Sequence, residues 1–218
     1  MIRRTQQQAD HQSRRTELLR IRTAVVGAAA LVLLVGCGTS GGTSGTPTTA
    51  SQPTSTSNSA GAPKISNPID VKVAEADPCG VVTATQLQTF GLPGVVGSLN
   101  TTSAGAGCLW PGTFTEAEMA PGMIISPAGT SLESLYAKKD ATYPVFEPLE
   151  VQGYPAAIAL VVDQRKKGNC ELFVGVSEDR VIMFSLQSEE KSKYFADPCA
   201  GATEFANLGM TTIKAGAK

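Results

Sequence analysis

Histidine is almost missing from this 218-residue sequence. The single histidine, His11, lies in the first 36 residues, which we expect to be removed during export. Without histidine, a chain cannot form a Ser-His-Asp triad, a Cys-His nucleophile pair or a histidine-ligated metal site. We therefore expect the mature protein to contain no catalytic residues, no metal and no other cofactor, and not to be an enzyme.

An excess of positive charge is also missing. The first 36 residues hold six of the 18 Lys and Arg residues but two of the 19 Asp and Glu residues, so the remainder is mildly acidic. A nucleic-acid partner requires a clustered basic surface that neutralises phosphates. We therefore expect no nucleic-acid partner, and we do not expect charge alone to hold the protein to anionic lipid.

The hydrophobic run Ala24–Val35 is too short to cross a bilayer. It has 12 residues, whereas a membrane-spanning helix needs about 20. A basic segment precedes the run, and small residues follow it. This order is typical of a secretory signal peptide, so we predict that residues 1–36 form one.

The run ends in Leu34-Val35-Gly36-Cys37, which matches the bacterial lipobox. The thiol of Cys37 would take a diacylglyceryl group, and the small residues before it would let a peptidase cut at Gly36. Two or three acyl chains, such as palmitate, anchor a protein stably because each buried CH₂ contributes about 0.8 kcal/mol. We expect the exported protein to sit on the outer face of the cell membrane. The alternatives are an ordinary signal peptide with a chance cysteine and an uncleaved helix.

Two export routes fit the basic segment. Ser13-Arg14-Arg15 partly resembles a twin-arginine signal. Glu17, however, stands where that motif has an aromatic or apolar residue. The general secretion route is therefore favoured over the twin-arginine route.

A low-complexity segment follows Cys37. From Gly38 to Pro63 the chain consists almost entirely of Gly, Ser, Thr, Pro and Ala and carries no charge. Such a segment cannot bury enough apolar surface to offset the entropy lost on ordering. We predict a disordered tether over residues 37–68, which could carry O-linked sugars.

Residues 69–218 have the pattern of one α+β domain. Asp77-Pro78 and Asp197-Pro198 combine an N-cap with proline at the first helical position. Three apolar runs joined by short polar turns in the C-terminal half predict an antiparallel meander. We expect a single antiparallel sheet packed by about three helices. The expected strands are 95–99, 108–110, 123–126, 146–151, 156–162, 172–176 and 181–186, and the expected helices follow Asp77, Thr130 or Ser131, and Asp197.

Four cysteines remain once Cys37 is lipidated, and the sequence has no C-x-x-C pair. An even number of cysteines in an oxidising compartment predicts two disulfides. Three pairings are possible for these four residues. We favour Cys79–Cys108 and Cys170–Cys199, because each bond would join a helix N-terminus to a strand nearby in the sequence. Each would close a loop of about 30 residues and contribute roughly 3.5 kcal/mol.

Several short motifs could carry chemistry. Ser188-Glu189-Glu190-Lys191 matches the S-x-x-K of penicillin-interacting enzymes, but the accompanying S-D-N and K-T-G motifs are missing. We interpret Ser188 as a strand end or exposed turn. The acidic pairs are expected to be solvated carboxylates in loops. These pairs are Glu116/Glu118, Glu178/Asp179 and Glu189/Glu190.

Three further features have a structural and a functional interpretation. Trp110 either packs on the disulfide core or lines an apolar groove. Tyr154, before Pro155, is interpreted as an aromatic residue of a turn. Arg165-Lys166-Lys167-Gly168 is a basic turn that is either simply solvated or in weak contact with an anionic envelope polymer.

Together these features resemble a family of actinobacterial envelope lipoproteins of unknown function. The resemblance extends over the chain after the leader and rests on the order of several short motifs. They are the lipobox, the tether, Asp77-Pro78-Cys79, Leu87, Cys108-Leu109-Trp110, Gly153-Tyr154-Pro155-Ala156, Cys170 and Cys199. The resemblance implies an envelope lipoprotein. It implies no substrate and no catalytic residue.

These observations lead to one expected function and two alternatives. We expect a membrane-anchored envelope module that binds an unknown envelope protein, glycan or lipid, or assists an assembly, without catalysis. The first alternative is a carrier for a hydrophobic envelope molecule. The second is a hydrolase or transferase that uses carboxylates or a Ser/Lys pair. Converging carboxylates in a deep pocket would favour the enzyme, whereas an apolar cleft or exposed patch would favour binding.

Overall fold

The computed structural model of this chain describes residues 61–216. The predicted signal peptide, Cys37 and residues 37–60 of the predicted tether lie outside these residues. Across the described part of the chain, every helix is too short or too polar to cross a membrane.

The centre of the domain is one seven-stranded antiparallel sheet with the order β1-β2-β3-β7-β6-β5-β4. Two runs of neighbouring strands, β1–β3 and β4–β7, meet where β3 pairs with β7. The predicted α+β class with a single antiparallel sheet is therefore confirmed. The strands are β1 (Ser98–Leu99), β2 (Ala106–Leu109), β3 (Met119–Ile125), β4 (Val145–Val151), β5 (Tyr154–Leu160), β6 (Asn169–Ser177) and β7 (Arg180–Ser188).

Five α-helices and two 3-10 helices accompany the sheet within residues 61–216. Three of the α-helices match predicted ones, and the two short helices α1 and α4 were not predicted. Their hydrophobic faces are too short to give a periodic signal. The helices are α1 (Lys72–Ala76), η1 (Pro78–Val81), α2 (Ala84–Phe90), α3 (Leu132–Tyr136), α4 (Lys139–Thr142), η2 (Arg165–Lys167) and α5 (Pro198–Gly216).

The hairpin turns follow from local residue chemistry. Gln152 and Gly153 both have positive φ and connect β4 to β5, as a two-residue hairpin turn requires. Tyr154 belongs to β5 and is buried, and its hydroxyl donates to the Asn67 carbonyl at 2.9 Å. The interpretation of Tyr154 as a turn residue is therefore wrong, because the turn ends one residue before it.

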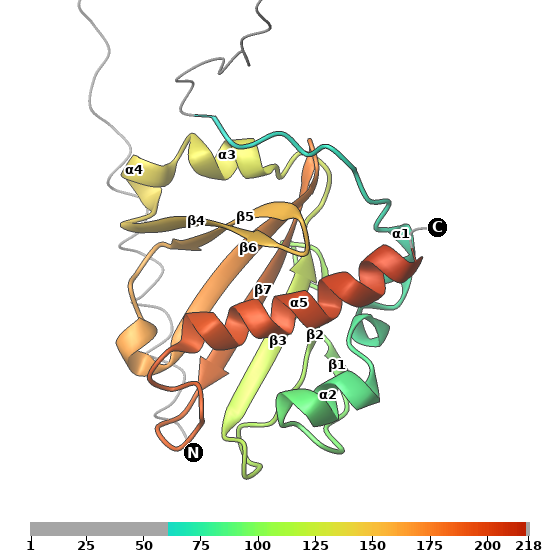
Figure 1. The fold of residues 1–218 in the computed structure, drawn as a ribbon, viewed down its shortest axis with the longest axis vertical. Helices are drawn as coiled ribbons and strands as arrows, with labels where there is room; N and C mark the ends of the chain where they lie inside the picture. The colour runs from blue at the N-terminus through green and yellow to red at the C-terminus, as the bar shows by residue number, and fades with distance from the viewer. Residues whose placement is uncertain (1–60, 217–218) are drawn as a thin grey trace, which may run out of the picture. The chain divides into compact units, whose positions relative to one another are not determined.

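Helix α5 covers one face of the sheet (Figure 1). Asp197 caps its first turn by accepting from the Ala200 N–H at 3.0 Å. Gly209 lets the helix lie close to the strands, because a Cβ there would be 2.7 Å from the Phe184 ring. The buried positions on α5 recur every three or four residues, so one face of the helix meets the sheet.

The core lies between α5 and the sheet. Phe205 is fully buried and contacts the rings of Phe90, Trp110 and Phe184, with centroids 5.1–6.4 Å apart. Trp110 is 1% exposed, and its indole lies beside the sulfur atoms of Cys79 and Cys108 around Gly97. Packing on the disulfide core, rather than an open groove, is therefore the role of Trp110.

Both predicted disulfides are present. Cys79, in η1, is bonded to Cys108 of β2, and Cys170 of β6 is bonded to Cys199 at the start of α5. Each bond joins a helix N-terminal turn to a strand, as the favoured pairing predicted. The second bond ties the first turn of α5 directly to the sheet that the helix covers.

The residues before α1 already belong to the folded domain. The Ala62 N–H donates to Glu133 at 2.7 Å, and Ile65 is buried, with its N–H donating to Glu178 at 3.2 Å. The Ile69 N–H donates to the Val176 carbonyl at 2.8 Å. Contact with the domain thus begins before Ile69, where the sequence placed the boundary, because Ile65 supplies an apolar anchor.

Candidate functional site

The sheet face opposite α5 is only partly covered. Helix α3 packs on one end of it, where Leu132, Ala157 and Val181 form a small buried cluster. Farther along, Ile124, Phe173 and Met183 are half-buried. We call this surface the open face, because the described residues leave its centre in contact with solvent.

One row of residues across the open face is made of small side chains around a carboxylate. The strand registers place Phe146 opposite Ala159 and Glu171 opposite Ser185. Ala159 is the first β5 residue after Ile158, which pairs with Leu172, so it lies on the Glu171 side of the sheet. The small neighbours in this row leave the Glu171 side chain exposed.

Strands β5 and β6 separate beside this row. Their ladder includes three residue pairs, from Ala156 opposite Val174 to Ile158 opposite Leu172. Beyond Ile158 the two strands diverge, since β5 continues to Leu160 along β4 while the start of β6 follows β7. The hollow between them has a volume of about 370 Å³. We call it the Glu171 cleft, and its lining residues are Leu160, Val161, Val162, Gln164, Asn169, Cys170 and Glu171.

Glu171 has no ionic partner among the ion pairs of residues 61–216. Its carboxylate keeps contact with water, but the surrounding strands supply enough non-polar atoms that burial raises its pKa. Burial also raises the pKa of the Tyr143 hydroxyl, and the negative charge of Glu171 adds to that increase.

Aromatic side chains also lie on the open face, although none of them lines the Glu171 cleft. The Phe146 ring packs edge-on against Tyr136, with centroids 4.8 Å apart, and lies 6.3 Å from the Tyr143 ring. Phe173 lies two residues after Glu171 on the same strand face. Phe146 and Phe173 therefore lie on the same face of the sheet as Glu171.

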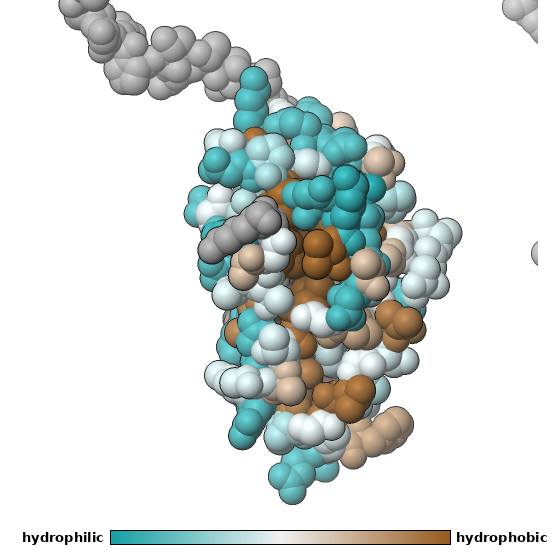
Figure 2. All heavy atoms as spheres, turned by 90° about the vertical axis from the view of Figure 1, so that its right-hand side faces the viewer, coloured by the Kyte–Doolittle hydropathy of each residue, from teal (hydrophilic) through white to brown (hydrophobic). Residues whose placement is uncertain are grey.

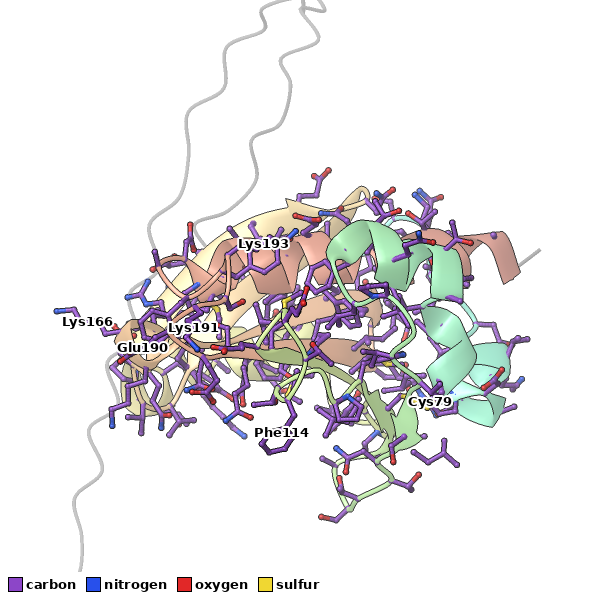
Figure 3. All side chains as sticks on the ribbon, turned by 90° about the horizontal axis from the view of Figure 1, so that it is seen from below. Cys79, Phe114, Lys166, Glu190, Lys191 and Lys193 are labelled. Carbon is purple, nitrogen blue, oxygen red and sulfur yellow. A yellow bond between two sulfur atoms is a disulfide. The ribbon has the colours of Figure 1, made fainter. Side chains whose placement is uncertain are left out.

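The cationic residue closest to the cleft along the chain is already paired. Arg165 donates to Asp163 at 2.9 Å and to Glu147 at 2.7 Å. The Arg165 contacts lower the pKa of Asp163 to about 2. Lys166 is exposed and lies at the outer end of the domain in Figure 3. The basic turn therefore supplies no ion pair to Glu171 in the described residues.

The chemical motifs singled out from the sequence are not assembled into a site. Ser188 ends β7 but is 2% exposed, and its hydroxyl donates to the Gly168 carbonyl at 2.9 Å. Ser188 is therefore the strand end that the sequence suggested and not an exposed turn, because the β5–β6 connection folds over it. The acidic pairs lie in turns as predicted, where Glu118 pairs with Lys191 at 3.1 Å.

Two other apolar surfaces are less suited to a ligand. A hollow of about 130 Å³ between α1 and the end of α5 is lined mainly by apolar side chains, including Val73 and Ile213. Figure 2 shows a band of apolar side chains on this side of the domain. Phe114 is fully exposed in the β2–β3 loop and points away from α5 (Figure 3). The lining of the first hollow includes Asp70, Asp77 and Thr212, but most of its surface is apolar.

Sequence reasoning missed Glu171 and Tyr143. The signal for Glu171 was present, because a single carboxylate interrupts the otherwise apolar strand Cys170–Val176. Tyr143 gave no such signal, since its approach to Glu171 depends on how α4 meets β4. Among residues 61–216, no cluster of three or more His, Cys, Asp or Glu side chains could hold a metal ion.

Comparisons with known proteins give a family but no activity. A search of curated proteins and a search of solved structures found no match. The sequence model of a family described as "Protein of unknown function (DUF3558)" matches residues 32–212, which is well over half of the chain. That range includes both disulfides and every residue of the Glu171 cleft. The chain belongs to this family of proteins of unknown function, DUF3558.

Proposed function

We propose that this chain is a lipid-anchored cell-envelope protein whose folded domain is a binding module rather than an enzyme. The lipid anchor would be carried by Cys37, and the ligand would be bound in the Glu171 cleft. These two parts rest on different observations and can fail separately.

The cysteine pairing is the observation that carries the anchor. Four of the five cysteines are consumed by the two disulfides of the domain, and Cys37 is the remaining one. Disulfides form in proteins that leave the cytosol. A cysteine that follows a signal-peptide pattern in such a protein is the residue that lipoprotein processing would modify.

Mass spectrometry of the chain purified from its host membrane tests the anchor. We expect an N-terminus at Cys37 with the mass of a diacylglyceryl group added. The variant Cys37→Ser should leave the membrane fraction, while Ser40→Ala, three residues away, should stay in it. An unmodified Cys37 in the mature protein, or membrane retention of Cys37→Ser, would contradict the proposal.

The separation of β5 and β6 carries the binding function. Where neighbouring strands stop pairing, their backbone N–H and C=O groups need another partner, which is either water or a ligand. Here the opening holds a carboxylate, two amide side chains and apolar walls. Its volume reaches the lower end of the range of small-molecule sites, about 300–1,000 Å³.

The two alternative functions have less support. A hydrolase would need a nucleophile next to a base, but Ser188 is buried and bonded to a carbonyl. A carrier of a large hydrophobic molecule would need an apolar chamber. The apolar hollow beside α1 measures about 130 Å³, and the space between α5 and the sheet is filled by side chains such as Phe205 and Phe184.

Site-directed photo-crosslinking in the envelope tests the binding function. A photoreactive residue replaces Val161, which lines the cleft and is 59% exposed, or Val73, which is 66% exposed beside α1. We expect a discrete adduct from position 161 and none from position 73, identified by mass spectrometry. Equal adducts from both positions, or none from either, would refute the cleft as the binding site.

A further inference from the structure

The chemistry of the cleft indicates what kind of ligand it takes. Building on the proposed binding function, we propose that the Glu171 cleft recognises an amino sugar, with the ammonium group held by the Glu171 carboxylate. The inference concerns the ligand class and not the anchor. It rests on the charge, the surroundings and the rim of the cleft.

The charge of the cleft is negative and uncompensated. Glu171 lacks an ion pair in residues 61–216, and Arg165 is already paired with Asp163 and Glu147. A partly desolvated carboxylate without a counter-charge costs free energy, and a cationic ligand offsets that cost through a charge-assisted hydrogen bond. A carboxylate or phosphate ligand would be repelled at the same position.

The surroundings of the cleft suit a ring with apolar and cationic parts. Phe146 and Phe173 lie on the same face of the sheet as Glu171. Aromatic faces attract an ammonium group within about 6 Å and also pack against the C–H face of a sugar ring. Val161 and Val162 add exposed apolar surface to the lining of the cleft.

The rim of the cleft offers partners for hydroxyl groups. The Gln164 side chain makes no hydrogen bond within the described residues, while its backbone carbonyl accepts from Lys167 and Asn169. Asn169 uses its amide N–H on the Lys167 carbonyl at 3.1 Å, which leaves its side-chain oxygen as an acceptor. Amides that both donate and accept are suited to the hydroxyls of a sugar.

A matched pair of ligands tests this inference. The probes are the β-1,4-linked tetramer of glucosamine and the same tetramer with every amine acetylated, which differ in charge and share their ring. Binding to the exported, disulfide-bonded chain is measured by isothermal titration calorimetry at low salt. We expect the charged tetramer to bind at least tenfold more tightly than the acetylated one.

Two variants test whether the preference for the charged tetramer arises in the Glu171 cleft. Glu171→Gln should abolish the tenfold preference by weakening the charged tetramer, with the acetylated tetramer unchanged. Glu150→Gln is the control, because Glu150 is an exposed carboxylate on the same sheet face at the far end of β4. Circular dichroism checks that both variants are folded.

Each result decides a different point. Equal binding of both tetramers, no binding of either, or a preference that survives Glu171→Gln would overturn the amino-sugar inference. A cleft crosslink at position 161 to a molecule without an amine would retain the binding function and reject this ligand class. A loss caused equally by Glu150→Gln would mean that the tetramer responds to overall charge, which also overturns the inference.

Discussion

The two faces of the sheet are built from the same strands but differ in how far they are buried. On the face under α5, Leu172, Val174 and Phe184 are completely buried. On the open face, the intervening residues Glu171 and Phe173 keep contact with solvent. A period of two along each strand sends neighbouring residues to different environments. One face therefore supplies the stability of the domain, and the other is free to carry a charged group that a closed core would not tolerate.

The largest difference between the faces should appear when one phenylalanine is removed from each. Phe205→Ala, in the covered core, should lower the free energy of unfolding by about 3–5 kcal/mol, because it leaves a cavity among buried rings. Phe173→Ala, on the open face, should cost about 1 kcal/mol. Chemical denaturation of the oxidised chain measures both. Equal losses would mean that the open face is as well packed as the core.

The disulfides should contribute almost as much as Phe205. The double variant Cys170→Ala/Cys199→Ala should lose about 3.5 kcal/mol, since the bond closes a loop with a sequence separation of 29. Cys79→Ala/Cys108→Ala is the matched control with the same separation, so a similar loss is expected. A loss confined to one pair would show that loop entropy does not govern the contribution of these bonds.

Replacing Glu171 should have a smaller effect on stability, and it should increase stability where the preceding variants decrease it. Folding raises the pKa of this carboxyl above its ordinary value near 4.5, so the folded state binds more protons than the unfolded state above that pH. The wild-type domain therefore loses stability as pH rises through the raised pKa. Glu171→Gln removes this loss and should increase Tm slightly at pH 7.

The same variant should behave like the wild type at low pH. Below the ordinary pKa, Glu171 is neutral in both the folded and the unfolded state, and the Tm difference should vanish. Thermal unfolding followed at several pH values measures this trend. A lower Tm for Glu171→Gln at pH 7 would mean that the carboxylate stabilises the open face, contrary to its lack of a partner.

The smallest effect is expected at the basic turn. Arg165→Ala removes ion pairs with Asp163 and Glu147 that are open to solvent, so the domain should lose less than about 1 kcal/mol. Urea denaturation in low and high salt measures the loss, which should shrink as salt increases. A loss as large as that of Phe205→Ala would place this turn within the core of the domain.

Most of the fold could be predicted because local chemistry marks it. Proline after aspartate identified the turns that begin at Pro78 and Pro198, and the apolar runs of β5, β6 and β7 identified the meander. Strand β3 begins four residues earlier than predicted, because Pro121-Gly122 has the composition of a turn. In the structure these residues pair with Leu186 and Ser185, and small side chains suit the crowded centre of the sheet.

The candidate site was harder to predict than the fold. The spacing of the cysteines was enough to identify both disulfides, because helix starts and strands nearby in sequence lie close in space. The Glu171 cleft instead arises where two strands cease to pair after Ile158, and this separation has no local sequence signal. Whether Tyr143 approaches Glu171 depends on the tertiary fold.

The way in which residues 61–71 are attached to the rest of the domain has a mechanical consequence. Residues 61–71 contact the domain through a few hydrogen bonds and the side chains of Ile65 and Ile69, and they lie outside both covalent loops. Tension applied from the N-terminal side would load this strap first and peel it away one contact at a time. The disulfide-linked part of the domain would bear force only after residues 61–71 had detached. Detachment of this strap would therefore protect the rest of the domain from unfolding under force.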